Sequence, residues 1–255
     1  MSLEVQYEEQ RLAVPEGVFV SGRIRKAARL FSRHLACRPV ERFLDIGCGE
    51  GKMAVYLAST IGSREVYGVD IAPSYAEDAR GMGVHAEQVD VDHEALPFPD
   101  GHFTAIFCGE VIEHLVDPDH LLDEIHRVLA PQGVCVITTP NLAGWHNRIA
   151  LLLGFQPFPE DVTIRYPNAG KLLFRSREGV GLHLRLFTHR ALKEVLRRHN
   201  FVVLQATGIR FSDHFELDKL PGRWRAPYPI VRPLDILMSR FPSLSPYSVV
   251  AVKNR

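Results

Sequence analysis

Apolar and polar positions follow two different periods along the first half of the chain. Between residues 23 and 36, apolar side chains recur every third or fourth position, which is typical of an amphipathic helix with one buried face. The short apolar run 42–46 leads into a cluster of glycines, which predicts a buried strand followed by a tight loop. The same patterns predict further helices at 52–61, 74–81 and 119–129, and strands at 65–69, 84–89, 103–108 and 134–138.

The pattern becomes less regular after Asn141. We expect helices at 142–153 and 189–199 and strands at 201–206 and 247–252. Strands that alternate with helices predict an α/β fold whose mostly parallel sheet is covered on both faces. We expect a single domain over residues 1–255, with a cofactor-binding core at 22–141 and two insertions, 142–181 and 211–242, over the ligand-binding end of the sheet.

Composition narrows the class of protein. Of the 255 residues, 46% are hydrophobic and 24% are charged, which excludes a chain that is mainly disordered. Lys and Arg number 30 and Asp and Glu also number 30, so the strong basic charge of a dedicated nucleic-acid binder is absent. The sequence does not determine the oligomeric state.

The cysteines, the first ten residues and the longest apolar run indicate the cellular compartment. None of the four cysteines, Cys37, Cys48, Cys108 and Cys135, forms a C-x-x-C pair, which favours a reducing compartment. The first ten residues are polar and acidic and do not resemble a signal peptide, and the apolar run 149–155 is too short to span a bilayer. We therefore expect a cytoplasmic protein with no transmembrane segment.

The sharpest local feature is the glycine-rich loop after the first strand. Gly47, Gly49 and Gly51 alternate with other residues where a strand passes into a helix, so the backbone can approach a ligand closely. Asp70 ends the next strand, 19 residues beyond Gly51, and an acid there can accept both hydroxyls of a ribose. A tight turn without a ligand is the alternative for the glycines alone.

Two kinds of ligand fit this loop: a dinucleotide, and a ligand that carries an amino group. A dinucleotide site expects G-x-G-x-x-G, whereas here the third glycine comes one position early and Asp45 precedes the loop. The Asp45 carboxylate is unfavourable beside a pyrophosphate and suits a ligand that carries an amino group. A nicotinamide-dependent oxidoreductase remains the alternative.

Residues 43–51 resemble motif I of the class I S-adenosylmethionine-dependent methyltransferases. The resemblance continues at Val69-Asp70, at the D-x-x-x-L-P-F segment 92–98 and at the Leu129–Gly133 turn. It implies a doubly wound, Rossmann-like sheet of seven strands, with the last strand antiparallel between the fifth and sixth. It also implies that the cofactor is bound by Asp45, Gly47, Cys48, Gly49, Gly51, Asp70, Ile71, Asp92, His93 and Gly109, with Asp70 on the ribose and Asp92 and the His93 backbone on the adenine.

A Glu-x-x-Glu-His run follows the expected strand 103–108. In a helical turn, Glu110, Glu113 and His114 would share one face. Carboxylates and imidazole are suitable ligands for Mg²⁺, Mn²⁺ or Zn²⁺, and His183 could supply a fourth group. A solvated helix start with a local hydrogen bond is the alternative.

The same run is similar to that of the ubiquinone-biosynthesis-type O-methyltransferases and of the small-RNA 2′-O-methyltransferases. In the RNA enzymes these residues hold a divalent metal, which implies a metal at Glu110, Glu113, His114 and His183. Many relatives with this run are not known to need a metal. His114, assisted by Glu113, can also remove the proton of an acceptor hydroxyl without one.

We therefore expect methyl transfer from S-adenosylmethionine to a small-molecule hydroxyl, with or without a metal. An RNA acceptor is the alternative suggested by the metal-like group and by the arginines at 165, 175, 177, 185 and 190. A catalytically silent cofactor-binding module is a third possibility, which the intact Glu-x-x-Glu-His run disfavours.

Overall fold

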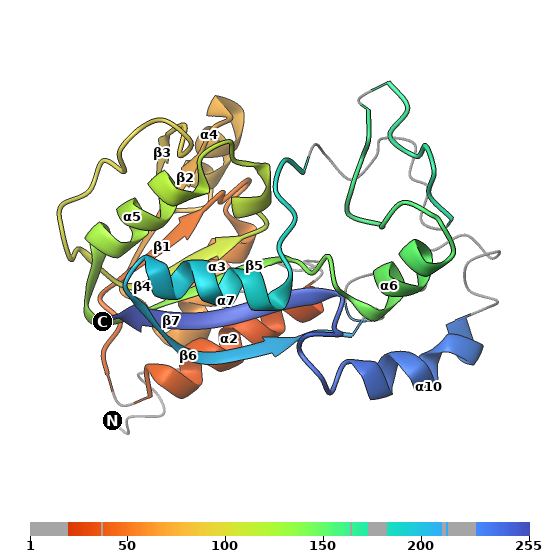
Figure 1. The fold of residues 1–255 in the computed structure, drawn as a ribbon. Coiled ribbons are helices and arrows are strands. Elements are labelled where there is room, and N and C mark those ends of the chain that lie inside the picture. The colour runs from red at the N-terminus through yellow and green to blue at the C-terminus, as the bar shows by residue number, and fades with distance from the viewer. Residues whose placement is uncertain (1–19, 37, 164, 173–182, 211–212, 214–227) are drawn as a thin grey trace.

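A seven-stranded sheet forms the centre of the protein (Figure 1). The computed structural model describes residues 20–255 except 37, 164, 173–182, 211–212 and 214–227. The strand order is β3-β2-β1-β4-β5-β7-β6. The strands are β1 (Arg42–Ile46), β2 (Glu65–Asp70), β3 (His85–Gln88), β4 (Phe103–Gly109), β5 (Leu129–Pro140), β6 (Phe201–Gly208) and β7 (Tyr247–Asn254).

Helices connect most of these strands in chain order. They are α2 (Gly22–His34), α3 (Lys52–Ile61), α4 (Pro73–Gly81), α5 (Pro118–Val128), α6 (Trp145–Leu152), α7 (His189–Arg198) and α10 (Tyr228–Met238), with a short 3₁₀ turn, η1 (Ile112–His114). No helix in the described part of the chain is both long and apolar enough to cross a membrane.

The strand directions confirm the expected topology. β1 pairs in parallel with β2 and β4, and β4 pairs in parallel with β5. β7 lies antiparallel between β5 and β6, as expected of a last strand inserted there. Ile46 is in register with Val69 on one side and with Cys108 on the other, so β1, β2 and β4 end together. The segments that follow these three strands therefore meet at one edge of the sheet.

Each face of the sheet has its own hydrophobic core. Successive strand residues point to opposite faces. Phe43 and Ala105 pack with α2, α3 and α4, whereas Leu44 and Ile106 pack with η1, α5 and α7. Because both faces are covered, the central strands β1, β4 and β7 are buried along most of their length, and their sequences read as short apolar runs. The edge strand β3 is exposed except at Ala86.

The transition from α5 to β5 differs from the sequence expectation. The helix was expected to include Leu129, with a turn before the strand, but Leu129 already begins β5 and pairs with Phe103. The register then shifts before Ala105 pairs with Val134, so residues 130–133 form an irregularity within the strand. The side-chain amide of Asn254 donates to the Leu129 carbonyl (3.1 Å) and so stabilises this distant end of β5.

The two insertions contain two helices with less regular sequences. α6 begins at Trp145 and not at residue 142, because the Leu142 N–H donates to the Phe187 carbonyl (2.9 Å) outside any helix. α10 was not expected, since Pro233 lies inside it and proline weakens a helical pattern. Residues 173–181 and most of 211–227, including Arg175 and Arg177, lie outside the described residues, as does Cys37.

Candidate active site

The glycine-rich loop extends from the end of β1 and lies over the end of β2. The N–H groups of Gly47 and Cys48 both donate to the Val69 carbonyl, at 2.8 and 3.0 Å. Gly47, Gly49 and Gly51 have φ angles of 74°, 51° and 80°, in the left-handed region that glycine adopts without strain. A Cβ on Gly49 would meet no atom within 4 Å, so the backbone there faces open space.

Asp70 lies at the end of β2 and fixes the loop. Its carboxylate accepts hydrogen bonds from the Gly49 N–H (2.9 Å) and the Ala72 N–H (3.0 Å). Each oxygen is left with further acceptor capacity. The next residue, Ile71, was also predicted to bind the cofactor. Its apolar side chain is 64% exposed, directly after Asp70.

Asp45 is buried below the loop. Burial, together with the nearby Asp70 carboxylate, raises the pKa of Asp45 well above its usual range. No hydrogen bond or ion pair joins the Asp45 carboxylate to another described residue. The neighbouring Cys48 thiol is also buried, and this raises its pKa to about 12, so Cys48 is a packing residue with little thiolate character. A buried carboxyl group without a partner is costly, and a cation beside it would favour its ionised form.

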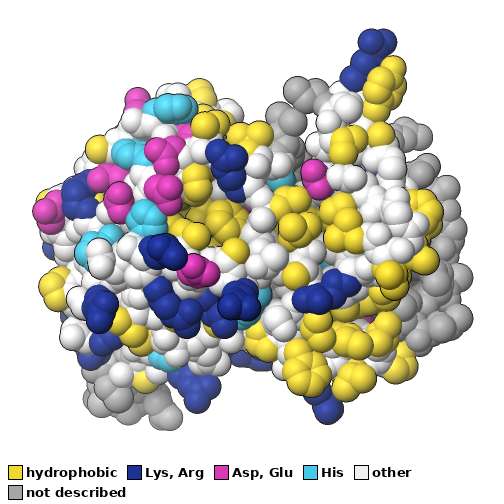
Figure 2. Space-filling view, viewed as in Figure 1, with side chains coloured by type: hydrophobic (Ala, Val, Ile, Leu, Met, Phe, Trp, Pro, Cys, Tyr) yellow, Lys and Arg dark blue, Asp and Glu magenta, His cyan; other side chains and the backbone are white. Residues whose placement is uncertain are grey.

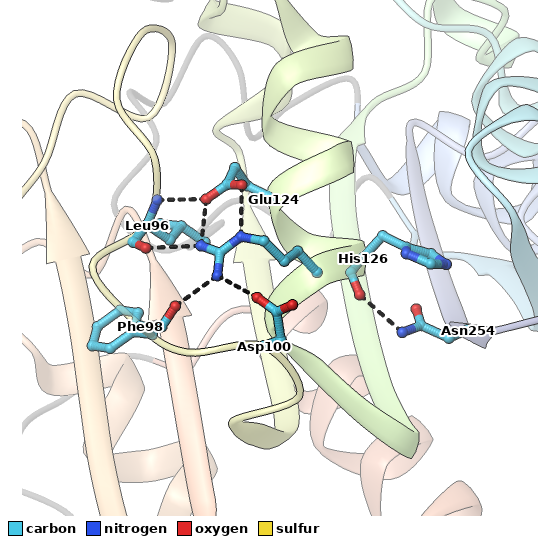
Figure 3. A network of polar contacts seen from close by, with 7 residues as sticks. Leu96, Phe98, Asp100, Glu124, His126 and Asn254 are labelled. Atoms are coloured by element: carbon cyan, nitrogen blue, oxygen red, sulfur yellow. Dashed lines mark hydrogen bonds and ion pairs between the residues drawn. The ribbon is translucent and has the colours of Figure 1, made fainter.

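The segment 96–98 is held against α5 by one arginine (Figure 3). The Arg127 guanidinium donates to the carbonyls of Leu96 (2.9 Å) and Phe98 (2.7 Å) and to both oxygens of Glu124. Glu124 in turn accepts the Leu96 N–H at 2.7 Å. We call these contacts the Arg127 network. The network fixes the Leu-Pro-Phe part of the segment that carries Asp92.

Asp92 itself binds the chain beyond η1. Its two oxygens accept the N–H groups of Val116 (2.9 Å) and Asp117 (2.7 Å). Burial acts to raise the pKa of Asp92, but these hydrogen bonds outweigh it, and the pKa is lower than usual. The His93 N–H, which the resemblance assigns to an adenine, donates to the Asp90 carbonyl at 3.0 Å. Asp92 and His93 are therefore both engaged within the protein.

Glu110 does not join the other members of the Glu-x-x-Glu-His run. The sequence predicts one helical turn for the run, but Glu110 has a φ of 59° and only Ile112–His114 are helical. The Glu110 carboxylate pairs with Arg23 of α2 and accepts the Thr138 hydroxyl hydrogen at 3.1 Å. The expected common face of Glu110, Glu113 and His114 is thus wrong, because the left-handed residue turns the chain before η1 begins.

The Arg23 side chain is a feature that the sequence analysis missed. Its guanidinium lies 5.2 Å from the centre of the Tyr247 ring and pairs with Glu110, next to Gly109 at the end of β4. It is mostly buried, and its Nε has no hydrogen-bond partner among the described residues. In the sequence, Arg23 lies in the first turn of an amphipathic helix, and the pattern gives no sign that its charged group points inward.

Glu113 is a buried carboxyl group at the centre of the site. It is fully buried, and burial together with the Glu110 charge raises its pKa well above the usual range. Thr139 donates its hydroxyl hydrogen to one carboxyl oxygen at 2.9 Å. The other oxygen, Oε1, has no hydrogen-bond partner among the described residues.

Backbone hydrogen bonds bring His183 to this carboxyl group. The N–H groups of Leu184 and Arg185 both donate to the Glu113 carbonyl, at 2.8 and 2.9 Å. The rings of His114 and His183 are then 4.8 Å apart between centroids. The His183 Nδ1 lies 2.5 Å from the Pro159 carbonyl, which can only accept, so this nitrogen carries the hydrogen. The Nε2 of neutral His183 is left as an acceptor.

Glu113, His114 and His183 form a group with the chemistry of a metal site. One ligand atom of each lies within 4.8 Å of the other two. Two imidazoles and one carboxylate are ligands that divalent transition metals accept. The same atoms can hold or move a proton, so the geometry permits metal-assisted chemistry as well as general-base chemistry. Three of the four residues predicted for a metal are together, and Glu110, which pairs with Arg23, is not a member of the group.

Comparison with known proteins identifies the family. The family model of the methyltransferase domain matches residues 19–206, which include the sheet from β1 to most of β6. The chain belongs to the methyltransferase-domain family. The superfamily that the motifs indicated, the class I S-adenosylmethionine-dependent methyltransferases, is thereby confirmed, and the sheet has the expected strand order.

Two named relatives match a part of this chain. The demethylmenaquinone methyltransferase of Thermus thermophilus is 36% identical over 101 residues, which are 38% of this chain and 46% of the relative. The ubiquinone biosynthesis O-methyltransferase of Psychrobacter cryohalolentis is 32% identical over 111 residues, 40% of this chain and 41% of the relative. In both cases the match spans less than half the length of the relative.

A solved structure resembles this chain over nearly its whole length. An S-adenosylmethionine-dependent methyltransferase from Mesorhizobium loti superimposes with a TM-score of 0.58 at 19% identity, covering 92% of this chain and 98% of that one. At this identity the likeness concerns the fold.

Proposed function

We propose that this methyltransferase transfers a methyl group from S-adenosylmethionine to a hydroxyl oxygen of a small-molecule acceptor. The observation that carries the proposal is the group of Glu113, His114 and His183, next to the edge where β1, β2 and β4 end. A hydroxyl must lose its proton as the methyl group arrives, and imidazole nitrogens accept protons near neutral pH.

The charges around the glycine-rich loop fit the amino-acid end of S-adenosylmethionine. We assign the ammonium group to the buried Asp45 carboxylate, which has no partner among the described residues, and the carboxylate group to the buried guanidinium of Arg23. Gly49 leaves room for the ligand, and Gly47 and Gly51 give the loop its left-handed turns. We assign Cys48 of the loop and Gly109 at the end of β4 to the same site. When bound, this cofactor supplies an electrophilic methyl group on a sulfonium.

The nucleoside end is assigned to the segments after β2 and β3. The Asp70 carboxylate accepts one hydrogen bond per oxygen from the backbone and retains capacity for two ribose hydroxyls. The exposed Ile71 side chain offers an apolar surface to the adenine. Asp92 remains our candidate for its polar edge, because each of its oxygens accepts one backbone N–H and keeps further acceptor capacity. The His93 N–H, also assigned to the adenine, would exchange its present bond with the Asp90 carbonyl for one with the ligand. The Arg127 network supports their segment from behind.

Proton removal is assigned to the two histidines. In this proposal His114 accepts the hydroxyl proton of the acceptor, and the Nε2 of His183 assists as a second acceptor. Glu113 orients the group through its hydrogen bond with Thr139. Holding the acceptor oxygen in line with the methyl group supplies much of the rate, because both reacting groups are already positioned.

A divalent metal also fits this group. The unpartnered Oε1 of Glu113, His114 and His183 would hold it, and Glu110 would not. Three protein ligands leave positions for the acceptor oxygen, and a metal lowers the pKa of a bound hydroxyl. Mg²⁺, Mn²⁺ and Zn²⁺ are the candidate ions.

The names of the two relatives favour a quinone-like acceptor, and only the ubiquinone biosynthesis enzyme is named an O-methyltransferase. One is named for demethylmenaquinone and the other for ubiquinone biosynthesis. We therefore propose a phenolic acceptor of the quinol type and give the RNA and nicotinamide alternatives no further weight. Within the single domain, the insertions 142–181 and 211–242 would cover this acceptor. We also propose the cytoplasmic location that the sequence leads us to expect.

The test measures transfer of a labelled methyl group to a panel of small phenols and hydroquinones. For His114→Gln we expect about a hundredfold slower turnover and an affinity for S-adenosylhomocysteine within about twofold of the wild type, since a general base contributes about that much. For Asp70→Ala we expect at least about tenfold weaker binding of S-adenosylhomocysteine in calorimetry.

Glu77→Ala, which removes an exposed acid from α4, is the matched control for Asp70→Ala and is expected to bind as the wild type does. Dialysis against EDTA, followed by return of Mg²⁺, Mn²⁺ or Zn²⁺, separates the metal-assisted from the metal-free route. Unchanged turnover of His114→Gln on a phenol that the wild type methylates would remove His114 from the chemistry.

A further inference from the structure

The two insertion helices, α6 and α10, lie together outside the sheet. They are the pair on the right of Figure 1. The Trp145 indole N–H donates to the Asp235 carboxylate at 3.3 Å, and the Trp145 backbone N–H donates to the Leu244 carbonyl at 2.8 Å. These contacts bury Asp235 and fix the helices as one unit, so their outward side chains form a single surface.

That surface exposes large apolar side chains. Figure 2 shows hydrophobic side chains gathered on the side of the molecule that α6 and α10 form. The exposed ones are Ile149, Leu151, Leu152, Leu153, Leu237 and Phe241. Leu152 is 85% exposed, the most of any large hydrophobic residue in the described part of the chain. Contiguous exposed apolar side chains of this kind mark an interaction site.

Three of these residues are consecutive. Leu151, Leu152 and Leu153, the leucine cluster, are 53%, 85% and 58% exposed at the end of α6. Successive residues of a helix point about 100° apart, so the three side chains project in different directions around the helix end. A rigid protein groove contacts one stripe of a helix, whereas a fluid apolar phase can surround its end. The geometry favours a lipid phase.

The exposed charges on the described residues of this surface have one sign. In the stretches 145–155 and 232–246, whose side chains the structure describes, the charged residues are Arg148, Arg232, Arg240 and Asp235. The three arginines are exposed, and the single acid is the buried Asp235. Apolar side chains bordered by arginines complement a membrane surface that carries anionic head groups.

Two hydrogen bonds connect the surface to the proposed active site. The Asn147 side-chain carbonyl on the inner side of α6 accepts the Phe158 N–H at 2.9 Å. The next residue, Pro159, provides the carbonyl that holds His183. A membrane that contacts α6 would therefore lie on the side from which the insertions lead to Glu113, His114 and His183.

We propose that the α6–α10 surface docks the protein on an anionic lipid bilayer, with the leucine cluster inserted among the acyl chains and the three arginines at the head groups. This places the enzyme where an apolar acceptor would be dissolved. Docking itself requires neither the proposed acceptor nor methyl transfer, so it can be tested without them.

The experiment measures co-sedimentation of the full chain with vesicles of phosphatidylcholine alone and with an equal mixture of phosphatidylcholine and phosphatidylglycerol. We expect binding to the anionic vesicles that weakens with salt. Leu152→Gln with Leu153→Gln is expected to lower the partition coefficient about tenfold or more. Arg232→Gln with Arg240→Gln is expected to lower it about tenfold on anionic vesicles.

Two matched double variants serve as controls. Tyr75→Gln with Val202→Gln removes two exposed apolar side chains from α4 and β6, and Arg190→Gln with Arg197→Gln removes two exposed arginines from α7. Both are expected to bind vesicles as the wild type does. The thermal midpoint of each variant shows that it is folded.

Three results would overturn the proposal. The first is a wild type that stays in the supernatant with anionic vesicles, and the second is equal binding by the leucine variant. The third is a wild-type dimer in sedimentation velocity that the leucine substitutions convert to monomers without any effect of lipid, since the surface would then be covered by a second copy of the chain.

Discussion

The glycine-rich loop contains residues with the same backbone conformation and different surroundings. Gly49 and Gly51 both have a positive φ. A Cβ on Gly51 would lie 3.0 Å from the Ala79 Cα and 3.2 Å from Val84, whereas a Cβ on Gly49 would meet nothing within 4 Å. Gly51 is therefore needed for the packing of α4 against the loop, and Gly49 for the open space above it.

This difference gives a prediction for two alanine variants. Gly51→Ala combines backbone strain with contact against the α4 backbone, and we expect a loss of about 2–4 kcal/mol in the free energy of unfolding. Gly49→Ala has the strain alone and should lose about 1–2 kcal/mol. Urea denaturation measures both. Equal losses would contradict the packing role of Gly51.

The same pair separates stability from ligand binding. If the open space above Gly49 is where the cofactor lies, Gly49→Ala should weaken S-adenosylhomocysteine binding more than its small loss of stability suggests. Calorimetry on the folded variant measures this directly.

At the scale of elements, the Arg127 network joins a loop without regular structure to α5. One guanidinium pairs with Glu124 and binds the carbonyls of Leu96 and Phe98. Side-chain hydrogen bonds with Arg127 hold the pKa of Glu124 below its usual range. The segment that carries Asp92 thus depends on a residue from a different element for its shape.

Arg127→Gln should be clearly destabilising. It leaves Glu124 and two carbonyls without their donor, and we expect a loss of about 2–3 kcal/mol in the free energy of unfolding. Arg198→Gln is the control, because the Arg198–Glu194 pair on α7 is exposed and should contribute at most about 0.5 kcal/mol. Denaturant midpoints that match between the two variants would show that the network does not stabilise the fold.

His199 joins the end of α7 to α5 and makes that contact pH-dependent. Its two ring nitrogens lie 2.8 Å from carboxylate oxygens of Asp119 and Asp123. Burial acts to lower the pKa of His199, but the two carboxylates outweigh it and raise the pKa above its usual 6.5. The folded state therefore binds the proton more tightly than the unfolded chain does.

The stabilisation from His199 should be fully present below pH 6.5 and lost as the pH rises through its raised pKa. The measurement is the difference in thermal midpoint between the wild type and His199→Asn at a series of pH values. We expect the difference to be largest in mildly acidic buffer and to shrink above neutral pH. A difference that grows with pH would mean that the carboxylates do not hold the imidazolium.

At the scale of the whole molecule, Asn141 connects the end of β5 to two distant segments, the start of α7 and the residues just before β7. Its side-chain carbonyl accepts the His189 N–H (3.1 Å) at the start of α7. Its amide donates to the carbonyls of Ser243 (3.1 Å) and Ser245 (2.7 Å), just before β7. Asn141 is fully buried, so these bonds have no competition from water.

Asn141→Asp tests this role with almost no change of shape. The substitution places a second acceptor oxygen against two carbonyls, and we expect a loss of about 3 kcal/mol or more in the free energy of unfolding. Asn200→Asp changes an exposed asparagine with a left-handed backbone, which aspartate tolerates, and should cost less than about 0.5 kcal/mol. Equal stability of the two variants would contradict the role of Asn141.

The sequence determined most of the strands and helices and the glycine-rich loop because their signals are local. Periodicity within one segment indicates which face is buried, and the glycines at 47, 49 and 51 need no distant partner to adopt a positive φ. The place of β7 came from family resemblance, since an antiparallel insertion leaves no mark on the strand's own pattern. α10 was missed because Pro233 lies inside it and proline is unfavourable within a helix. The helix forms in the folded chain although its own sequence disfavours it.

Only the tertiary structure decided which residues share the candidate site. A left-handed backbone at Glu110 lets it pair with Arg23, outside the group of Glu113, His114 and His183, although Glu110 and Glu113 are three positions apart. Two backbone hydrogen bonds to the Glu113 carbonyl bring the segment of His183 beside His114. Contacts of this kind depend on the path of long connecting segments, where no period links the partners, so they are set by packing and hydrogen bonding in the folded chain.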